Sequence, residues 1–202
     1  MNTSSTHHIT APSLRGDEEL AGPRGAGERY TRTTIVLHWF IGIALLAQLA
    51  FGWIVSEIPR HTPARGYYVN LHKSVGITLG ILILLRLAWR LTHRPPAMPS
   101  FMEKWQRLAA LATHRLLYVL MVAMPTLGYV ASNFSEHGVK FFGHPLPPWG
   151  PDLPAVYKLL NGAHIVCAYV LATVIALHVL AALQHAVIKR DGIFWRIWLT
   201  RN

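Results

Sequence analysis

The sequence is poor in several residue types and motifs, and each shortage excludes a class of structure or function. Cysteine occurs once among the 202 residues, at Cys167, so a disulfide within the chain is excluded, and its place in an apolar stretch predicts a buried packing role. Acidic residues number nine against 19 lysines and arginines. The sequence contains no glycine-rich phosphate-binding loop and nothing that resembles a hydrolytic or nucleophilic site. What it does contain is 52% hydrophobic residues and 12 histidines.

The hydrophobic residues gather in four stretches, at about 34–55, 71–91, 108–131 and 162–188. Each is about 20 residues or longer, the length that an α-helix needs to cross ~30 Å of hydrocarbon. Each is apolar around its whole circumference, whereas a surface helix of a soluble protein has one apolar stripe. The sequence therefore predicts an all-α membrane protein, a bundle of four transmembrane helices in a lipid bilayer.

Prolines and tyrosines suggest where these helices end. Pro59 and Pro63 should stop the first helix, and a short outer loop with Tyr67 and Tyr68 should lead into the second. Residues 97–107 are predicted to lie along the inner surface as an amphipathic segment. The proline-rich loop of roughly 30 residues after the third helix predicts a folded cap without long helices.

The basic residues are distributed unevenly between the two ends of the predicted helices. A net charge of +10 can indicate nucleic-acid binding, but here 14 of the 19 basic residues lie on the side that holds both termini. This positive-inside asymmetry predicts cytoplasmic termini and no nucleic-acid partner. Residues 1–29 are predicted to be a flexible cytoplasmic tail and residues 30–202 the membrane domain. The five outer basic residues are Arg60, Arg65, Lys73, Lys140 and Lys158.

Six histidines fall in or at the ends of the four helices: His38, His72, His114, His164, His178 and His185. Ionisable side chains are costly to place in a membrane, so they tend to face the bundle interior and mark function. A single histidine could instead hydrogen-bond a neighbouring helix or lie at the interface. The number and spacing of these histidines favour a functional role.

The spacing on the fourth helix predicts two cofactors. His164 and His178 are 14 residues apart, which places them within about 40° of one direction and ~21 Å apart along the axis. That distance is too long for one metal ion, but it suits two haems stacked across the membrane. His72 lies at the depth of His164, and His38 is available for the inner position. Two neutral imidazoles on each iron would favour electron transfer over oxygen binding.

Two of the histidines and some of the glycines have more than one interpretation. His185 is seven residues beyond His178 and only about 20° away on the helical wheel, so depth does not separate them. His114 fits packing at the interface as well as function. Gly42, Gly76 and Gly80 follow the histidines of their helices and could let a flat macrocycle approach, but Gly76 and Gly80 also form a common helix-packing motif.

Several short motifs occur together, and the match that they make covers roughly residues 30–196. The motifs are Arg29-Tyr30, Leu37-His38-Trp39, Leu71-His72-Lys73-Ser74-x-Gly76, Arg86-Leu-x-x-Arg90 before Pro95-Pro96, His114-Arg-Leu-Leu-Tyr118, Met124-Pro125-x-x-Gly128 and His164-x13-His178. As a set they resemble the bacterial cytochrome b561 family, which belongs with the di-haem cytochrome b subunits of hydrogenases and formate dehydrogenases. The resemblance implies a multi-pass protein of the bacterial inner membrane.

The resemblance also implies a ligand set of two bis-histidine haems b. It pairs His72 with His164 at the outer haem and His38 with His178 at the inner haem, which selects His178 over His185. Lys73 and Arg86 could pair with haem propionates, although membrane orientation alone also explains these basic residues.

Three functions compete at this point. The first is a di-haem cytochrome that passes electrons between an unknown donor and the quinone pool, with superoxide as donor and ubiquinone as acceptor in similar proteins. The second is a membrane-anchor subunit of a dehydrogenase or hydrogenase. The third is a small transporter or proton channel that uses the histidines as a relay. A homodimer is compatible with each.

Overall fold

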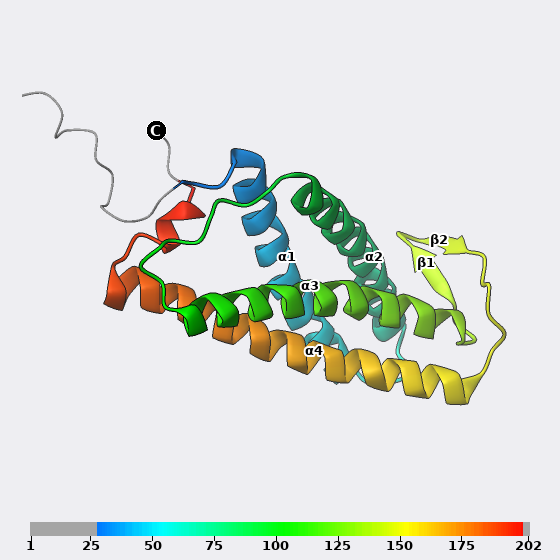
Figure 1. Ribbon diagram of the computed structural model, residues 1–202. Helices are drawn as coiled ribbons and strands as arrows, with labels where there is room; N and C mark the ends of the chain where they lie inside the picture. The colour runs from blue at the N-terminus through cyan, green and yellow to red at the C-terminus, as the bar shows by residue number, and fades with distance from the viewer. Residues whose placement is uncertain (1–27, 200–202) are drawn as a thin grey trace, which may run out of the picture.

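The computed structural model describes residues 28–199, so the predicted tail lies outside the described residues except for its last two positions. Within that range the long helices are α1 (Arg32–Glu57), α2 (Pro63–Thr92), α3 (Lys104–Asn133) and α4 (Pro154–Leu183) (Figure 1). A π-helical turn (Gln184–Lys189) continues α4, and a short 3-10 helix (Phe194–Arg196) follows. The strands β1 (Val139–Phe141) and β2 (His144–Leu146) form an antiparallel hairpin between α3 and α4.

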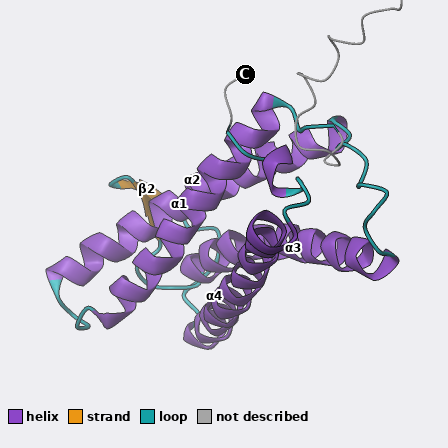
Figure 2. Ribbon diagram, turned by 90° about the vertical axis from the view of Figure 1, so that its left-hand side faces the viewer, coloured by secondary structure: helices purple, strands orange, loops and turns teal. Residues whose placement is uncertain are grey.

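The four helices pack as two neighbouring pairs that share one core. Figure 2 shows α1 beside α2 and α3 beside α4, and α2 also contacts α3. Buried side chains from every helix meet in the core, including Ile41 of α1, Ile83 of α2, Met121 of α3 and Leu171 of α4. Cys167 belongs to this cluster and is a free thiol, in agreement with its predicted packing role. The core is narrow, and many large apolar side chains point outward instead.

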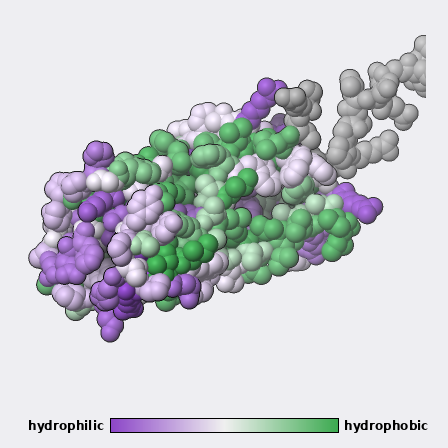
Figure 3. All heavy atoms as spheres, turned by 180° about the vertical axis from the view of Figure 1, so that it is seen from behind, coloured by the Kyte–Doolittle hydropathy of each residue, from purple (hydrophilic) through white to green (hydrophobic). Residues whose placement is uncertain are grey.

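The outward-facing apolar side chains show which solvent surrounds the bundle. Leu159 is 73% exposed and Ile188 is 75% exposed, and Figure 3 shows an apolar band across the middle of one face with polar residues gathered at its ends. Leaving so much hydrocarbon in water would be unfavourable by roughly 25 cal/mol per Å² of apolar surface. All four helices are long and apolar enough to cross a membrane. The prediction of a four-helix transmembrane bundle is therefore confirmed, with the small hairpin as an addition.

The second helix begins well before its apolar stretch. Pro63 is its first residue, where a proline is favoured because the missing N–H would have no helical partner, and the Thr62 side chain accepts a hydrogen bond from the Arg65 backbone N–H. The expected loop containing Tyr67 and Tyr68 is consequently wrong, since both tyrosines lie in the first turns of α2. Pro63 therefore is the first residue of α2 and also separates α2 from α1.

The last two helices also start earlier than their apolar stretches. Glu103 and Gln106 form a capping box at the start of α3, so Lys104 to Arg107 belong to that helix and not to a surface segment. In α4 the helix begins at Pro154, again with proline in the first turn. The connection between α3 and α4 is correspondingly shorter and contains the hairpin. Its turn residues Phe142 and Gly143 both have positive φ, 46° and 90°, as a two-residue hairpin turn requires.

Both ends of the described chain meet at the same end of the bundle, as the predicted topology requires. Arg196 is 5% exposed, and its guanidinium donates to the carbonyl oxygens of Glu28 and Ala97, each at 2.8 Å. The backbone N–H of Tyr30 in turn donates to the Arg196 carbonyl oxygen at 3.2 Å. One side chain thus joins the segment before α1, the α2–α3 connection and the segment after α4.

We expect Arg196→Ala to lower the free energy of unfolding by roughly 3 kcal/mol, because two hydrogen bonds from a charged group are lost and two carbonyls lose their partner. Thermal unfolding of the purified protein in detergent measures this change. Arg94→Ala, at an exposed position of the same end, is the control and should behave like the parent protein. Equal melting temperatures for both variants would contradict the role given to Arg196.

Candidate cofactor-binding site

Four of the predicted histidines lie in two pairs at different depths between the helices. His72 of α2 and His164 of α4 have ring centroids 6.3 Å apart with planes at 85°. His38 of α1 and His178 of α4 have ring centroids 6.2 Å apart with planes at 69°. Helix α4 therefore contributes one imidazole to each pair. We call these the outer pair, near the hairpin end, and the inner pair, near the chain ends.

The distance within each pair fits a metal held between two imidazoles. A metal–imidazole bond of about 2 Å on each side, plus roughly 1 Å from each nitrogen to its ring centre, places two ring centres about 6 Å apart. Both observed separations agree with this value. Among residues 28–199 there is no group of three or more His, Cys, Asp or Glu side chains suited to a bare ion. Two imidazoles suffice when a porphyrin supplies the equatorial ligands.

A third imidazole lies beside the inner pair. The ring centroids of His114 and His178 are 5.3 Å apart, about 1 Å less than the separation within either pair. His178 thus lies next to both His38 and His114, and the shorter separation fits two bridging metal–imidazole bonds less well. The sequence did not decide between packing and a functional role for His114, because the approach of α3 to α4 is set only in the folded bundle.

His185 is held by a different partner. Its Nδ1 lies 2.6 Å from a carboxylate oxygen of Asp191, and both side chains are about 15% exposed. The other carboxylate oxygen of Asp191 accepts from the Ile193 backbone N–H at 3.2 Å. His185 therefore belongs to a polar contact at the end of the π-helical turn, and this favours His178 as the partner of His38.

The outer imidazoles are oriented by uncharged groups. His164 Nδ1 donates to the Met124 carbonyl oxygen at 2.9 Å, and because a carbonyl can only accept, the Nε2 of a neutral His164 keeps its lone pair for a metal. His72 Nδ1 lies 3.1 Å from the amide nitrogen of Gln48, which also donates to the His72 carbonyl oxygen at 2.7 Å. Gln48 is 6% exposed and faces the interior of the bundle. Its position in the sequence did not reveal its contact with His72.

The inner pair has a charged neighbour. Arg86 Nη2 lies 2.9 Å from His38 Nδ1, and the Arg86 guanidinium carbon lies 5.6 Å from the centroid of the Tyr118 ring. The sequence suggested Arg86 as a partner for a haem propionate, and that role stays a prediction. What the structure adds is a hydrogen bond from this cation to a candidate ligand. A guanidinium can only donate, so His38 Nδ1 accepts, and a neutral His38 in this arrangement carries its proton on Nε2.

The hairpin segment between α3 and α4, which we call the outer cap, is hydrogen-bonded to the residues that follow His72. Lys73 Nζ donates to the Gly138 carbonyl oxygen at 2.8 Å, and the buried Ser74 hydroxyl accepts from the Phe142 backbone N–H at 2.9 Å. The hairpin is thereby bound to the two residues that follow an outer imidazole. Lys73, suggested as a propionate partner, is hydrogen-bonded to the cap here, and its cofactor-binding role stays a prediction.

Two glycines that the sequence did not connect with the histidines lie against the outer imidazoles. A Cβ at Gly52 would lie 3.0 Å from His72 Cε1, and a Cβ at Gly128 would lie 3.0 Å from both Cε1 and Nδ1 of His164. Gly42, by contrast, has nothing within 4 Å of where its Cβ would lie.

The remaining two glycines serve helix packing. A Cβ at Gly76 would meet Gln48 of α1 at 3.4 Å, and one at Gly80 would meet Pro125 of α3 at 3.3 Å. The packing alternative is therefore favoured for Gly76 and Gly80, and the close approach to the imidazoles belongs to Gly52 and Gly128.

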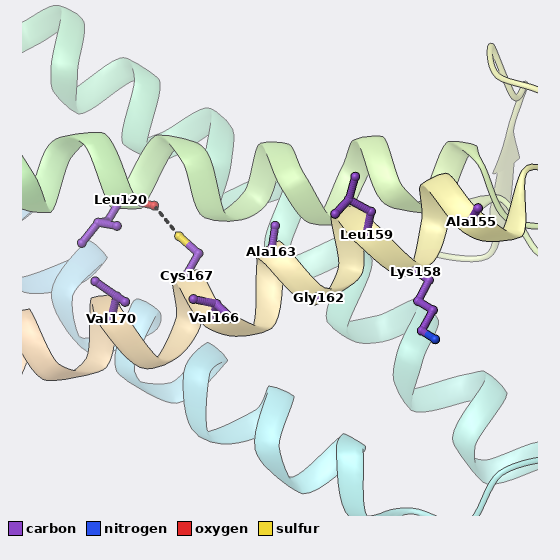
Figure 4. Close-up of a pocket in the computed structure, with 9 residues that line it drawn as sticks. All are labelled: Leu120, Ala155, Lys158, Leu159, Gly162, Ala163, Val166, Cys167 and Val170. Atoms are coloured by element: carbon purple, nitrogen blue, oxygen red, sulfur yellow. Dashed lines mark hydrogen bonds between the residues drawn. The ribbon is translucent and has the colours of Figure 1, made fainter.

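An apolar groove lies elsewhere on the bundle. It has a volume of about 840 Å³, and Figure 4 shows it along α4 beside Leu120 of α3, with Cys167 near one end and Lys158 near the other. Its lining is apolar apart from Lys158 and includes none of the six helix histidines. A surface of this kind suits lipid hydrocarbon, so the groove is separate from the candidate cofactor site.

Four membrane-crossing helices with two imidazole pairs at different depths define a class, the helical membrane cytochromes of b type. The family model of the prokaryotic cytochrome b561 matches residues 29–199, and the chain belongs to this family.

Curated relatives agree with this membership over most of their length. The chain is 30% identical to cytochrome b561 homolog 2 of Escherichia coli over 84% of the chain and 91% of that protein. It is 27% identical to cytochrome b561 homolog 1 of Escherichia coli, over 86% of the chain and 99% of that protein. It is 25% identical to a probable superoxide oxidase, CybB, of Yersinia pestis, over 84% of the chain and 96% of that protein.

Family membership establishes the general function. The chain is a bacterial multi-pass membrane protein of electron transport that binds haem b. When bound, haem b supplies an iron that takes up and releases one electron at a time. The imidazole spacing and the glycines beside the outer rings fit such a group. The transporter alternative has no comparable support.

Proposed function

We propose that this protein carries electrons across the bacterial inner membrane through two haems b, one held by the outer pair and one by the inner pair. The observation that carries the proposal is the presence of two imidazole pairs with nearly equal separations, 6.3 and 6.2 Å. Because His164 and His178 are ~21 Å apart along α4, the two positions lie toward opposite sides of the membrane.

The residues around each pair support this arrangement. His164 is fixed by a backbone carbonyl, His72 by Gln48, and His38 by Arg86, so three of the four rings have a defined orientation. Of these partners, the Met124 carbonyl accepts from Nδ1 and leaves Nε2 of His164 free for a metal. Gln48 and Arg86 donate to Nδ1, so His72 and His38 would have to move their proton from Nε2 to Nδ1 before Nε2 could bind a metal. Two histidines would hold each haem, and the haem would supply one-electron chemistry without a free position for oxygen.

The proposed acceptor is a quinone, and the proposed donor is superoxide on the outer side. Two superoxide anions would release two electrons and leave two molecules of oxygen, and one ubiquinone would take up these electrons with two protons to give ubiquinol. Two observations support this assignment. One relative is named a probable superoxide oxidase, and the outer basic residues, such as Lys140, would attract an anion.

Haem content tests the core of the proposal. The purified protein should contain two haems b per chain by the pyridine haemochrome assay and should give a b-type spectrum on reduction. One haem per chain would refute the two-site relay, and a protein that acquires no haem under conditions that load a known b cytochrome would refute both sites. Peptide concentration from amino-acid analysis makes the ratio independent of the haem spectrum.

The donor and acceptor are tested separately. Superoxide generated enzymatically should reduce the loaded protein in the presence of catalase, and added ubiquinone should reoxidise it. Superoxide dismutase is the control, because it removes the donor and should abolish reduction. If the protein binds two haems but superoxide reduces neither of them, the donor assignment is wrong while the two-haem proposal stands.

A further inference from the structure

The apolar groove along α4 has one charged lining residue, Lys158, near its outer end. Figure 4 shows the lysine side chain extending away from the helix. Lys158 is exposed, and no carboxylate among residues 28–199 forms an ion pair with its ammonium. It precedes Gly162, where the apolar stretch of α4 begins, by about 6 Å along the helix axis. The lysine therefore lies at the level of the lipid headgroups, and the groove continues from it into the hydrocarbon.

The length of the groove matches one leaflet of a bilayer. The lining residues extend inward as far as Val170, which is about 18 Å from Lys158 along the axis of α4. One leaflet contributes half of the ~30 Å of hydrocarbon, or about 15 Å. A lipid with its headgroup at Lys158 could therefore place one acyl chain along the whole groove, whose volume is about 840 Å³.

Charge distinguishes the candidate occupants of the groove. A second copy of the chain, packed through this face in the usual twofold arrangement, would bring two Lys158 ammonium groups to the same depth, where like charges repel. The isoprenoid tail of a quinone has no anion to pair with the lysine. A phospholipid with a net negative headgroup offers both a partner for the ammonium and a hydrocarbon chain for the apolar wall.

We propose that the groove binds one anionic phospholipid of the outer leaflet, with the phosphate paired to Lys158 and one acyl chain against Gly162, Val166 and Val170. The lipid would cover the outer half of the helix that carries His164, and it would also touch Leu120 of α3. Because a ligand of the folded state stabilises that state by mass action, the melting temperature should rise with the lipid concentration. This inference goes beyond the proposed function and does not depend on the number of haems.

Native mass spectrometry of the full chain, loaded with haem and purified in detergent with graded amounts of lipid, tests the proposal. The probes are phosphatidylglycerol and phosphatidylcholine with identical acyl chains, which both contain phosphate but differ in net charge. The parent protein should bind one phosphatidylglycerol about fivefold more tightly than phosphatidylcholine, the preference expected from one lysine near a membrane surface. Lys158→Gln should lose this preference, and Lys158→Arg should keep it.

Two further variants distinguish the groove from the surface charge. Gly162→Phe should weaken the binding of both lipids, because a Cβ at Gly162 meets nothing within 4 Å and the ring can fill the groove. Lys140→Gln is the matched control, since it removes the same charge from an exposed position on the outer side, outside the groove, and should bind lipid like the parent protein. A haem content equal to that of the parent shows that each variant is folded.

Several results would overturn the proposal. Equal losses in Lys158→Gln and Lys140→Gln would mean that general surface charge attracts the lipid, and unchanged binding in Gly162→Phe would place the acyl chain elsewhere. A dimeric parent that becomes monomeric in Gly162→Phe would assign the groove to a second copy, and displacement of phosphatidylglycerol by ubiquinone would assign it to a quinone tail. If Gly162→Phe does not fold, the exposed substitution Lys158→Gln decides. The haem content of the parent tests the proposed function separately.

Discussion

His164→Ala is expected to reduce the haem content of this cytochrome from the proposed two per chain to one. The ring centroid of His164 lies 6.3 Å from that of His72, and alanine removes one of the two histidines proposed to hold the outer haem. A haem held by His72 alone would bind far more weakly and would expose an open coordination position. The measurement is the pyridine haemochrome ratio together with the reduced spectrum, and the remaining haem should retain a bis-histidine signature in electron paramagnetic resonance.

His178→Ala provides the reciprocal experiment at the inner pair. It should also leave one haem, but the haem that remains should differ in potential from the one that remains in His164→Ala. Retention of one haem in each variant shows that the bundle still folds, so a general loss of structure is distinguished from loss of a ligand. His185→Ala is the control on the same helix, because that ring contacts Asp191 and should be dispensable for haem content.

Two results would contradict the ligand assignment. If His178→Ala retained two haems while His185→Ala lost one, the inner ligand would be His185. If His114→Ala lost the inner haem while His38→Ala did not, the partner of His178 would be the ring at 5.3 Å and not the one at 6.2 Å.

The apolar stretches predicted the number and type of the helices, because a membrane requires about 20 apolar residues per crossing whatever the packing. They did not predict where each helix begins. Pro63 and Pro154 occupy first-turn positions that lie outside the apolar stretches, and their compatibility with helix starts depends on backbone hydrogen bonding, not on hydropathy. Tyr67 and Tyr68 were misplaced for the same reason.

The histidines were easier to find than the residues that surround them. Spacing on one helix indicated that His164 and His178 share a face, since helical periodicity is local. The contacts of Gln48 with His72, and of Gly52 with the same ring, depend on how α1 crosses α2, which the periodicity of either helix does not specify. Small residues within a transmembrane helix have many uses, so the glycines near the rings were not distinguishable from those that pack helices.

Gly128→Ala is expected to weaken haem binding at the outer pair roughly tenfold, within the range seen when groups that orient metal ligands are changed. The added methyl group would lie 3.0 Å from both Cε1 and Nδ1 of His164, which is closer than ordinary contacts, so the ring must shift. A shift of the ring also lengthens its 2.9 Å hydrogen bond to the Met124 carbonyl oxygen. Haem titration into the protein prepared with limiting haem measures the affinity of each site.

Gly66→Ala, at an exposed position near the start of α2, is the matched control for this change. It makes the same substitution inside a transmembrane helix, but the new methyl group meets nothing within 4 Å. Both substitutions should favour the helix intrinsically by up to about 1 kcal/mol, because glycine loses more backbone freedom on folding than alanine. Gly128→Ala should therefore bind less haem without any loss of helix stability, and Gly66→Ala should load fully. If both variants load equally, the approach of α3 to His164 does not shape the outer site, and the haem there must be held without help from that helix face.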